Sequence, residues 1–226
     1  EHDASQFSFK AGDALYATFE VRTVDVIQGF GSDGRVYTVP VSELPGARGD
    51  GSPLTSFVNL AAGSQMVAYY AGQPDDLVLL STRAGYGFLA NVSDMSTRNK
   101  AGKSFITIDA KVAGDAPLGA TKVQTGMKQV ACLSEASKLL VFPLDELKRL
   151  PTGGKGVILM GLDDKEFMAS AIAVGPNGAA YFGAGRAGKP TELSLDAKTL
   201  KSFAGNRARK GHFVEPRLKD GKLKAN

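Results

Sequence analysis

The stretch TRNKAGKS, residues 97–104, has residue types and a spacing that could bind phosphate. The phosphate-binding loop of mononucleotide enzymes follows G-x-x-x-x-G-K-[ST], in which backbone N–H groups and the lysine surround the phosphates. The final Gly-Lys-Ser matches that pattern, whereas Thr97 stands where the first glycine belongs. A second near-match, residues 183–190, ends in Pro190 and lacks the hydroxyl. A nucleotide site is therefore the first hypothesis to test against the neighbouring elements.

The composition is that of a β-rich domain with many turns. The chain has 226 residues, 43% of them hydrophobic, with 27 Gly, 10 Pro and a net charge of +4. No apolar run approaches the roughly 20 residues of a membrane span. The polar start, EHDASQFSFK, has no signal-peptide pattern, and the single Cys132 fits a reducing compartment. We expect a cytoplasmic protein.

Four copies of a repeat of about 50 residues occupy most of the chain. Each copy contains a turn, an apolar strand, a short V-S-E-L-like step and a loop rich in glycine and basic residues. The steps begin at Val41, Val92, Leu144 and Leu195, which are 51, 52 and 51 positions apart. The approximate repeats are 24–76, 77–129, 130–170 and 171–212. Such a period indicates a repeat architecture.

Apolar segments on both sides of glycine-rich turns predict one β-hairpin in each repeat. The pairs are 24–27 with 35–39, 77–80 with 86–89, 130–133 with 139–142, and 171–174 with 179–182. Only the V-S-E-L-like steps suggest helix, and each is long enough for one turn. The predicted fold is all-β, a propeller-like disc of repeated four-stranded blades.

The two ends of the chain predict one further blade. Segments 7–19 and 213–224 are both strand-like, and we expect them to pair, giving about five blades in a closed or broken ring. Two stacked β domains are the alternative.

Against this background the nucleotide hypothesis fails. A nucleotide loop precedes a long helix whose N-terminus holds the phosphates, but TRNKAGKS is one of four equivalent loops and precedes the alternating strand 105–108. The second near-match precedes another alternating segment, 191–195. Two G-x-G-x-x-G stretches, 29–34 and 183–188, do not open a helix either. These glycines are better interpreted as turn residues.

The repeated loops still share cationic side chains. Placed at one position of each blade, they would form a discontinuous basic track along the rim of a disc. Duplex DNA could follow such a track through its phosphates, largely independently of sequence. The alternative is that they are ordinary solvated surface residues. The candidate DNA-binding residues are Arg48, Arg98, Lys100, Lys103, Lys155, Arg207, Arg209 and Lys210.

Catalysis finds little support in the residues. The two histidines, His2 and His212, suggest no triad, and the acidic pairs Asp75-Asp76 and Asp163-Asp164 are typical of solvated turns. The sequence predicts no metal site and no cofactor for this chain, and no enzyme activity for it alone. A propeller-type protein-interaction platform is an alternative function.

The repeats and loops resemble the C-terminal domain of type IIA topoisomerase A subunits. The step GRVYTVPVSELP and the stretches FKAGDA, LPGARG, AGYGF and TRNKAGK are similar in particular to topoisomerase IV A subunits. The resemblance implies a β-pinwheel whose blades exchange a strand and which binds and bends duplex DNA on its rim. It also implies a bacterial, nucleoid-associated holoenzyme with an ATPase B subunit, ATP and Mg²⁺, whose catalytic tyrosine lies outside this chain.

One departure separates two members of that family. Gyrase A carries the box QRRGGKG, needed to wrap DNA, whereas the equivalent first-repeat loop here is PGARGDG, residues 45–51. The nearest imitation, TGGKG at 152–156, lacks the arginines. The resemblance therefore favours topoisomerase IV, which relaxes supercoils and decatenates DNA, over a gyrase wrapping domain.

Overall fold

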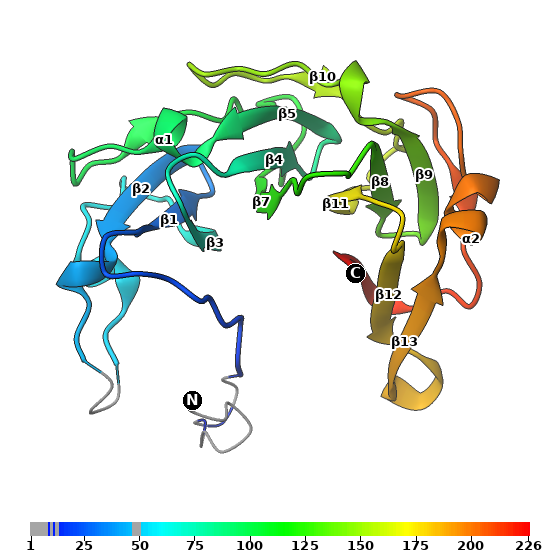
Figure 1. The fold of residues 1–226 in the computed structure, drawn as a ribbon, viewed down its shortest axis with the longest axis horizontal. Helices are drawn as coiled ribbons and strands as arrows, with labels where there is room; N and C mark the ends of the chain where they lie inside the picture. Colours follow the sequence, from blue (N-terminus) through cyan, green and yellow to red (C-terminus); the bar gives the residue numbers. More distant parts are fainter. Residues whose placement is uncertain (1–8, 10, 12–13, 47–50) are drawn as a thin grey trace.

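The structure, a computed structural model, describes residues 9, 11, 14–46 and 51–226. In these residues the strands form four antiparallel sheets, which stand side by side around an open arch (Figure 1). From the inner to the outer edge, the first sheet contains β3 (Met66–Gly72), β1 (Val26–Gly31), β2 (Arg35–Pro40) and β6 (Lys103–Ser104), and the second contains β7 (Pro117–Lys122), β4 (Leu77–Thr82), β5 (Tyr86–Asn91) and β10 (Val157–Ile158). The third sheet contains β11 (Met168–Val174), β8 (Gln129–Ser134), β9 (Lys138–Pro143) and β14 (His212–Phe213). The fourth contains β15 (Lys219–Ala225), β12 (Ala179–Ala184) and β13 (Pro190–Leu195). The predicted all-β, propeller-like fold is confirmed.

The hairpins of the two middle sheets are apolar on both faces because each of these sheets packs between two others. Along β4, Val78 and Leu80 belong to the core shared with the first sheet, whereas Leu79 belongs to the core shared with the third sheet. Successive side chains of a strand point to opposite faces, so a strand buried on both sides needs a continuous apolar run. Burial of such runs supplies most of the stabilisation of stacked sheets.

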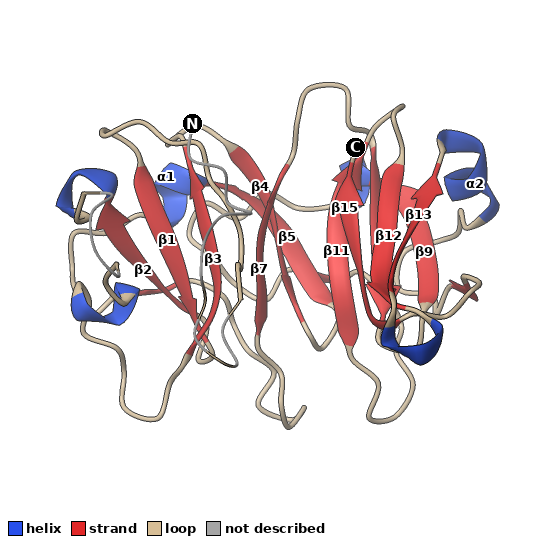
Figure 2. Cartoon of the chain, turned by 90° about the horizontal axis from the view of Figure 1, so that it is seen from below, coloured by secondary structure: helices blue, strands red, loops and turns tan. Residues whose placement is uncertain are grey.

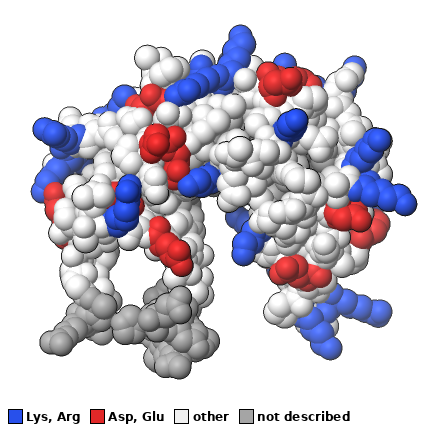
Figure 3. All heavy atoms as spheres, viewed as in Figure 1, with Lys and Arg blue, Asp and Glu red and all other residues white. Residues whose placement is uncertain are grey.

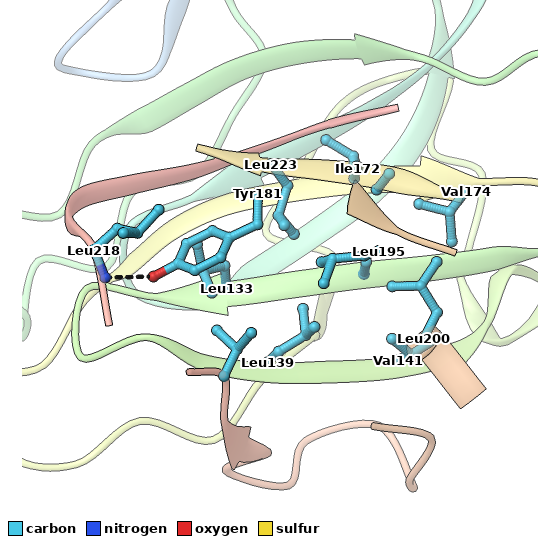
Figure 4. Close-up of a cluster of buried hydrophobic side chains, with 13 residues drawn as sticks. Leu133, Leu139, Val141, Ile172, Val174, Tyr181, Leu195, Leu200, Leu218 and Leu223 are labelled. Atoms are coloured by element: carbon cyan, nitrogen blue, oxygen red, sulfur yellow. Dashed lines mark hydrogen bonds between the residues drawn. The ribbon is translucent and has the colours of Figure 1, made fainter. Parts of the chain in front are cut away.

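Between the third and fourth sheets, the core closes around Tyr181 (Figure 4). Its ring is fully buried, its hydroxyl donates to Ser137 Oγ at 2.9 Å, and it accepts from the Leu218 N–H at 2.8 Å. A buried phenol needs such partners. These two bonds hold the turn of the third sheet and the start of β15 against the fourth sheet.

Short helices follow the central hairpins, as the V-S-E-L-like steps predicted. They are η2 (Val41–Glu43), α1 (Val92–Met95), η4 (Leu144–Glu146) and α2 (Ala197–Ser202), with η3 (Leu54–Ser56) and η5 (Arg186–Gly188) elsewhere in the loops. At α1 the Asn91 N–H donates to Asp94 at 2.8 Å, and at α2 the Asp196 carboxylate accepts from the Thr199 N–H at 2.7 Å. Both contacts satisfy backbone donors near a helix start.

Two sequence predictions differ from the structure. Segments 171–174 and 179–182 do not form a hairpin, because β11 pairs with β8 while β12 pairs with β13 and β15. The turn Pro176-Asn177-Gly178 therefore links two sheets. The described part of 7–19 does not pair with the C-terminal segment either: β14 joins β9 and β15 joins β12, and in the described residues the sheets number four. Part of 7–19 lies outside those residues, and 14–19 have no strand.

Each of the first three sheets receives its outermost strand from the following repeat. β6 pairs with β2, β10 with β5 and β14 with β9. The opposite edge of each sheet, formed by β3, β7, β11 or β15, lies along the inside of the arch (Figures 1 and 2). The loops that deliver the exchanged strands consequently form the outer edge.

Candidate nucleic-acid interface

Three loops, residues 96–102, 147–156 and 203–211, build the outer edge of the arch; we call them the rim loops. Each crosses from its own sheet to the outermost strand of the preceding one. Leu89 of β5 donates its N–H to the Lys148 carbonyl at 2.9 Å and accepts from the Leu150 N–H at 2.8 Å. Val141 of β9 makes the same pair of bonds with Phe203 and Gly205, both at 2.9 Å. The second and third rim loops are therefore extensions of the sheets.

A glycine with positive φ ends each rim loop, immediately before the exchanged strand. The φ values are 71° at Gly102, 76° at Gly156 and 72° at Gly211. A Cβ on Gly156 would lie 2.1 Å from the Gly87 carbonyl oxygen, and one on Gly211 would lie 2.5 Å from that of Leu139. Glycine is required here by chain geometry and by the close approach of a neighbouring strand. The Gly-Lys-Ser of residues 102–104 thus has a structural cause that needs no nucleotide.

Three of the predicted DNA-binding cations point back into the protein. Lys103 Nζ donates to the Asp94 carbonyl at 2.7 Å, and Lys155 Nζ pairs with Asp109 at 2.8 Å. Arg207 Nη1 donates to the Ile158 carbonyl at 2.6 Å, and its Nε lies 3.4 Å from Glu146 Oε2. We call Lys103, Lys155 and Arg207 the inward cations. These contacts tie Lys103 in β6 to α1, Lys155 in the second rim loop to the segment that follows β6, and Arg207 in the third rim loop to β10.

The ion pair at Lys155 affects both partners. The ammonium also lies 4.1 Å from the centre of the Tyr86 ring. The hydrogen bond from Lys155 lowers the pKa of Asp109 below its usual value, and the bond to Asp109 raises the pKa of Lys155. Both groups are charged at neutral pH, so Lys155 is already neutralised before any phosphate approaches.

Lys210 also has an acidic partner. It pairs with Asp163, which pairs in turn with Lys138, and Lys138 Nζ lies 3.0 Å from Glu166. Hydrogen bonds from Lys138 and Lys210 lower the pKa of Asp163 to about 2. This cluster joins the third rim loop to the third sheet.

Arg98, Lys100 and Arg209 behave differently. All three are exposed, and no side-chain hydrogen bond or ion pair to any of them occurs in the residues that the structure describes. Arg48, the remaining predicted cation, lies outside the described residues. The structure therefore divides the predicted set into fastened and available side chains, a division that spacing alone does not reveal.

Sequence reasoning missed two available cations, Lys148 and Arg149. Both are exposed on the second rim loop, where their backbone runs along β5. They directly follow the step that ends at Leu147, and the shared register of steps and loops could have identified them. We call Arg98, Lys100, Lys148, Arg149 and Arg209 the outward cations. Figure 3 shows Lys and Arg side chains at intervals along the outer edge, with acidic groups between them.

Other kinds of site find no support in the described residues. No group of three or more His, Cys, Asp or Glu side chains there is placed to hold a metal ion. Cys132 is buried in the core between the second and third sheets, where burial raises its thiol pKa. Among the helices of the described residues, none has the length and apolar character needed to cross a bilayer.

The architecture defines a class: an all-β disc of sheets that exchange outer strands and carry cationic loops on the rim. The chain belongs to the family whose model is described as DNA gyrase C-terminal domain, beta-propeller, which matches residues 30–63, 76–114 and 128–174. This confirms the family and the β-pinwheel fold that the repeats and loop motifs predicted.

Individual relatives place the chain more narrowly. It is 32% identical to the A subunit of DNA topoisomerase 4 from Neisseria gonorrhoeae, over 92% of this chain and 27% of that protein. It is also 32% identical to the corresponding protein from Pseudomonas aeruginosa, over 93% of this chain and 28% of that protein. The chain thus spans about a quarter of the length of these relatives.

Solved structures agree on the fold. The E. coli ParC C-terminal domain superposes with a TM-score of 0.79 at 23% identity, covering 100% of this chain and 92% of that one. The DNA gyrase A C-terminal domain superposes with a TM-score of 0.65 at 18% identity, covering 88% and 64%. At these sequence identities, the similarity to both structures shows the fold alone.

Proposed function

We propose that this chain binds duplex DNA along its outer edge, as the non-catalytic C-terminal domain of a topoisomerase IV A-type polypeptide. The observation that carries the proposal is the set of outward cations on three successive rim loops. Unpaired guanidinium and ammonium groups contact phosphates at little desolvation cost to the protein, and they release condensed counterions from DNA. The fastened cations contribute the shape of the edge.

DNA held in this way would be bound largely independently of sequence. The rim is convex, so a duplex that touches successive loops must bend around it. Five outward cations, if each met one phosphate, would give a slope of about −4.5 in log affinity against log salt. Arg48 in the first-repeat loop is the further candidate that the sequence supplies.

The relatives support the wider assignment. Within the complete protein, the domain would guide DNA for strand passage in decatenation and supercoil relaxation. The catalytic tyrosine would lie elsewhere in the same polypeptide, and an ATPase B subunit would supply the ATP-dependent, Mg²⁺-dependent step. We place that enzyme in the bacterial cytoplasm, on the nucleoid. The first-repeat loop PGARGDG lacks the gyrase box, which favours this role over gyrase wrapping.

The test is fluorescence anisotropy of a random-sequence duplex, titrated with protein at several salt concentrations. One variant changes the five outward cations to Gln. A control variant of equal charge changes five exposed cations away from the rim loops: Arg186, Lys189, Lys219, Lys222 and Lys224. We expect the first variant to lose most binding and most of the salt slope, and the control to retain both. Equal losses in the two variants would show that net charge, and not the rim, determines binding.

A further inference from the structure

The last sheet of the arch has an outer edge that could accept one more strand. The first three sheets have four strands, but the fourth is ordered β13-β12-β15. In the described residues nothing pairs with the outer edge of β13, which corresponds to the edges of β2, β5 and β9 that receive an exchanged strand. The fourth sheet is therefore an acceptor without a donor.

The free edge offers the same backbone groups that the other sheets use. Leu89 and Val141 pair with the rim loops, and they lie opposite Leu79 and Ala131 of their hairpins. Leu193 holds the corresponding position opposite Tyr181 in β13. Because alternate residues of a strand direct their N–H and C=O to the same side, Thr191 and Leu193 present theirs outward.

The first repeat carries the matching donor without an acceptor. Each exchanged strand follows the pattern glycine, two residues, apolar residue, at 102–105, 156–159 and 211–214, and 51–54 (Gly-Ser-Pro-Leu) repeats it. Gly51 has φ 75°, close to that of the three rim-loop glycines. None of the described residues lies within 4 Å of the place where its Cβ would stand.

Pro53 is compatible with strand exchange. In the three filled sites the apolar residue donates its N–H to the hairpin turn: Phe105 to Gly34 at 3.3 Å, Leu159 to Gly85 at 2.7 Å and Val214 to Ser137 at 2.9 Å. The residue before it must then point its N–H away from the acceptor. Pro53 occupies that position, so its missing N–H costs no hydrogen bond.

The outward faces of the two end sheets carry apolar side chains. On the first sheet, Leu54 packs with Phe57 against Tyr37 and Val58. On the fourth sheet, Phe182 is 36% exposed and borders a hollow lined by Ala184, Pro190 and Thr191. At the filled junctions, equivalent faces stack on each other as core.

We propose that residues 51–54 of one copy of this chain add to β13 of a second copy, head to tail. Ser52 would pair with Thr191 and Pro53 with Pro190, as Lys103 pairs with Val36 and Ser104 with Arg35. Strand addition to a free edge is a common mode of recognition. The two surfaces differ, so the contact is heterologous and each copy keeps one donor and one acceptor. This proposal is independent of DNA binding.

The first test is a disulfide between copies. Ser52→Cys and Thr191→Cys proteins are prepared separately, mixed and oxidised; the native Cys132 is buried. Directly opposed residues have Cα atoms about 5.5 Å apart, within disulfide range. We expect a crosslinked dimer that contains one of each variant, and at least tenfold less when Ser194→Cys, on the same strand, replaces Thr191→Cys.

A chain that carries both Ser52→Cys and Thr191→Cys shows whether residues 51–54 of a second copy or of the same chain lie on β13. Crosslinked oligomers are expected if a second copy is the donor, whereas a crosslinked monomer would mean that the arch closes on itself and would overturn the proposal.

The second test is sedimentation of the chain without cysteine substitutions. We expect the average mass to rise with concentration, and Thr191→Pro to abolish the rise because it removes the outward N–H, while Thr191→Ala retains it. Proline is tolerated where an edge N–H faces solvent, so Thr191→Pro should still fold. A strictly monomeric wild-type chain, together with no specific crosslink, would refute the idea.

Discussion

Arg207 and Arg209 lie two residues apart on the same rim loop, yet one side chain contacts the protein and the other is exposed to solvent. Arg207 donates to the Ile158 carbonyl at 2.6 Å and approaches Glu146, whereas Arg209 is exposed and has no side-chain partner in the described residues. The same contrast separates Lys155 from Lys148 and Arg149 on the neighbouring loop. Each rim loop therefore has an inward part that builds the edge and an outward part that is available to a polyanion.

The difference shows why a basic loop is weak evidence for binding when it is read residue by residue. A cation that is hydrogen-bonded to a carbonyl or paired with a carboxylate must lose that partner before it meets a phosphate, and this cost offsets much of the gain. An unpaired exposed cation has no such cost. Stability should therefore follow the inward parts of the loops, and DNA affinity the outward parts.

The largest effect on stability should come from Gly156, the glycine that ends the second rim loop. Gly156→Ala must adopt φ near 76° and place a Cβ 2.1 Å from the Gly87 carbonyl oxygen. Backbone strain and the clash together should lower the free energy of unfolding by about 3 kcal/mol, measured by urea denaturation. Gly63 has φ 77° but open space around it, so Gly63→Ala should cost only about 1 kcal/mol. Equal costs would mean that the strand contact is unimportant.

The second effect concerns the inward arginine. Arg207→Ala removes the donor to Ile158 and the partner of Glu146, and should lower the free energy of unfolding by about 1–2 kcal/mol. DNA binding by the folded protein, measured by anisotropy at a temperature far below the transition, should change less than twofold. A large loss of affinity without a loss of stability would move Arg207 into the outward class.

The third effect concerns the outward Arg209, where DNA affinity and not stability should change. Arg209→Ala should leave the urea midpoint unchanged within error, because the side chain has no partner to lose. It should weaken DNA binding by roughly three- to fivefold and reduce the salt slope by about 0.9. An unchanged slope would remove Arg209 from the interface.

The smallest effect is pH-dependent and belongs to Asp163. Its pKa is about 2 in the folded chain, below the value of about 3.9 for an unfolded aspartate. A lowered folded pKa stabilises the protein above about pH 4, and this contribution is lost as the pH falls toward 2. Asp163→Asn should therefore be less stable than wild type at pH 7, with the difference shrinking as the pH falls from about 4 toward 2. A difference that is constant with pH would contradict the ion pairs with Lys138 and Lys210.

Several features followed from local sequence rules. The pairing of the first hairpin was predicted because apolar runs and turn glycines define it within about 15 residues, although its first strand is 26–31 and not 24–27. The rejection of TRNKAGKS as a nucleotide loop followed from its repetition. The pairing of the C-terminal segment was not predictable in this way: β15 takes the position beside β12 that β11 takes beside β8, and two strand-like ends do not indicate which edges they will meet.

The sequence by itself determined the repeat, three of the hairpins and the position of a basic loop in each unit, since these depend on period, turn chemistry and side-chain type. Only the tertiary structure decided which loop cations are free, because partners such as Asp109 for Lys155 and Ile158 for Arg207 come from a different repeat. It also decided that the arch ends in one unfilled edge, because strand exchange moves each donor one sheet back and leaves the last sheet without a successor.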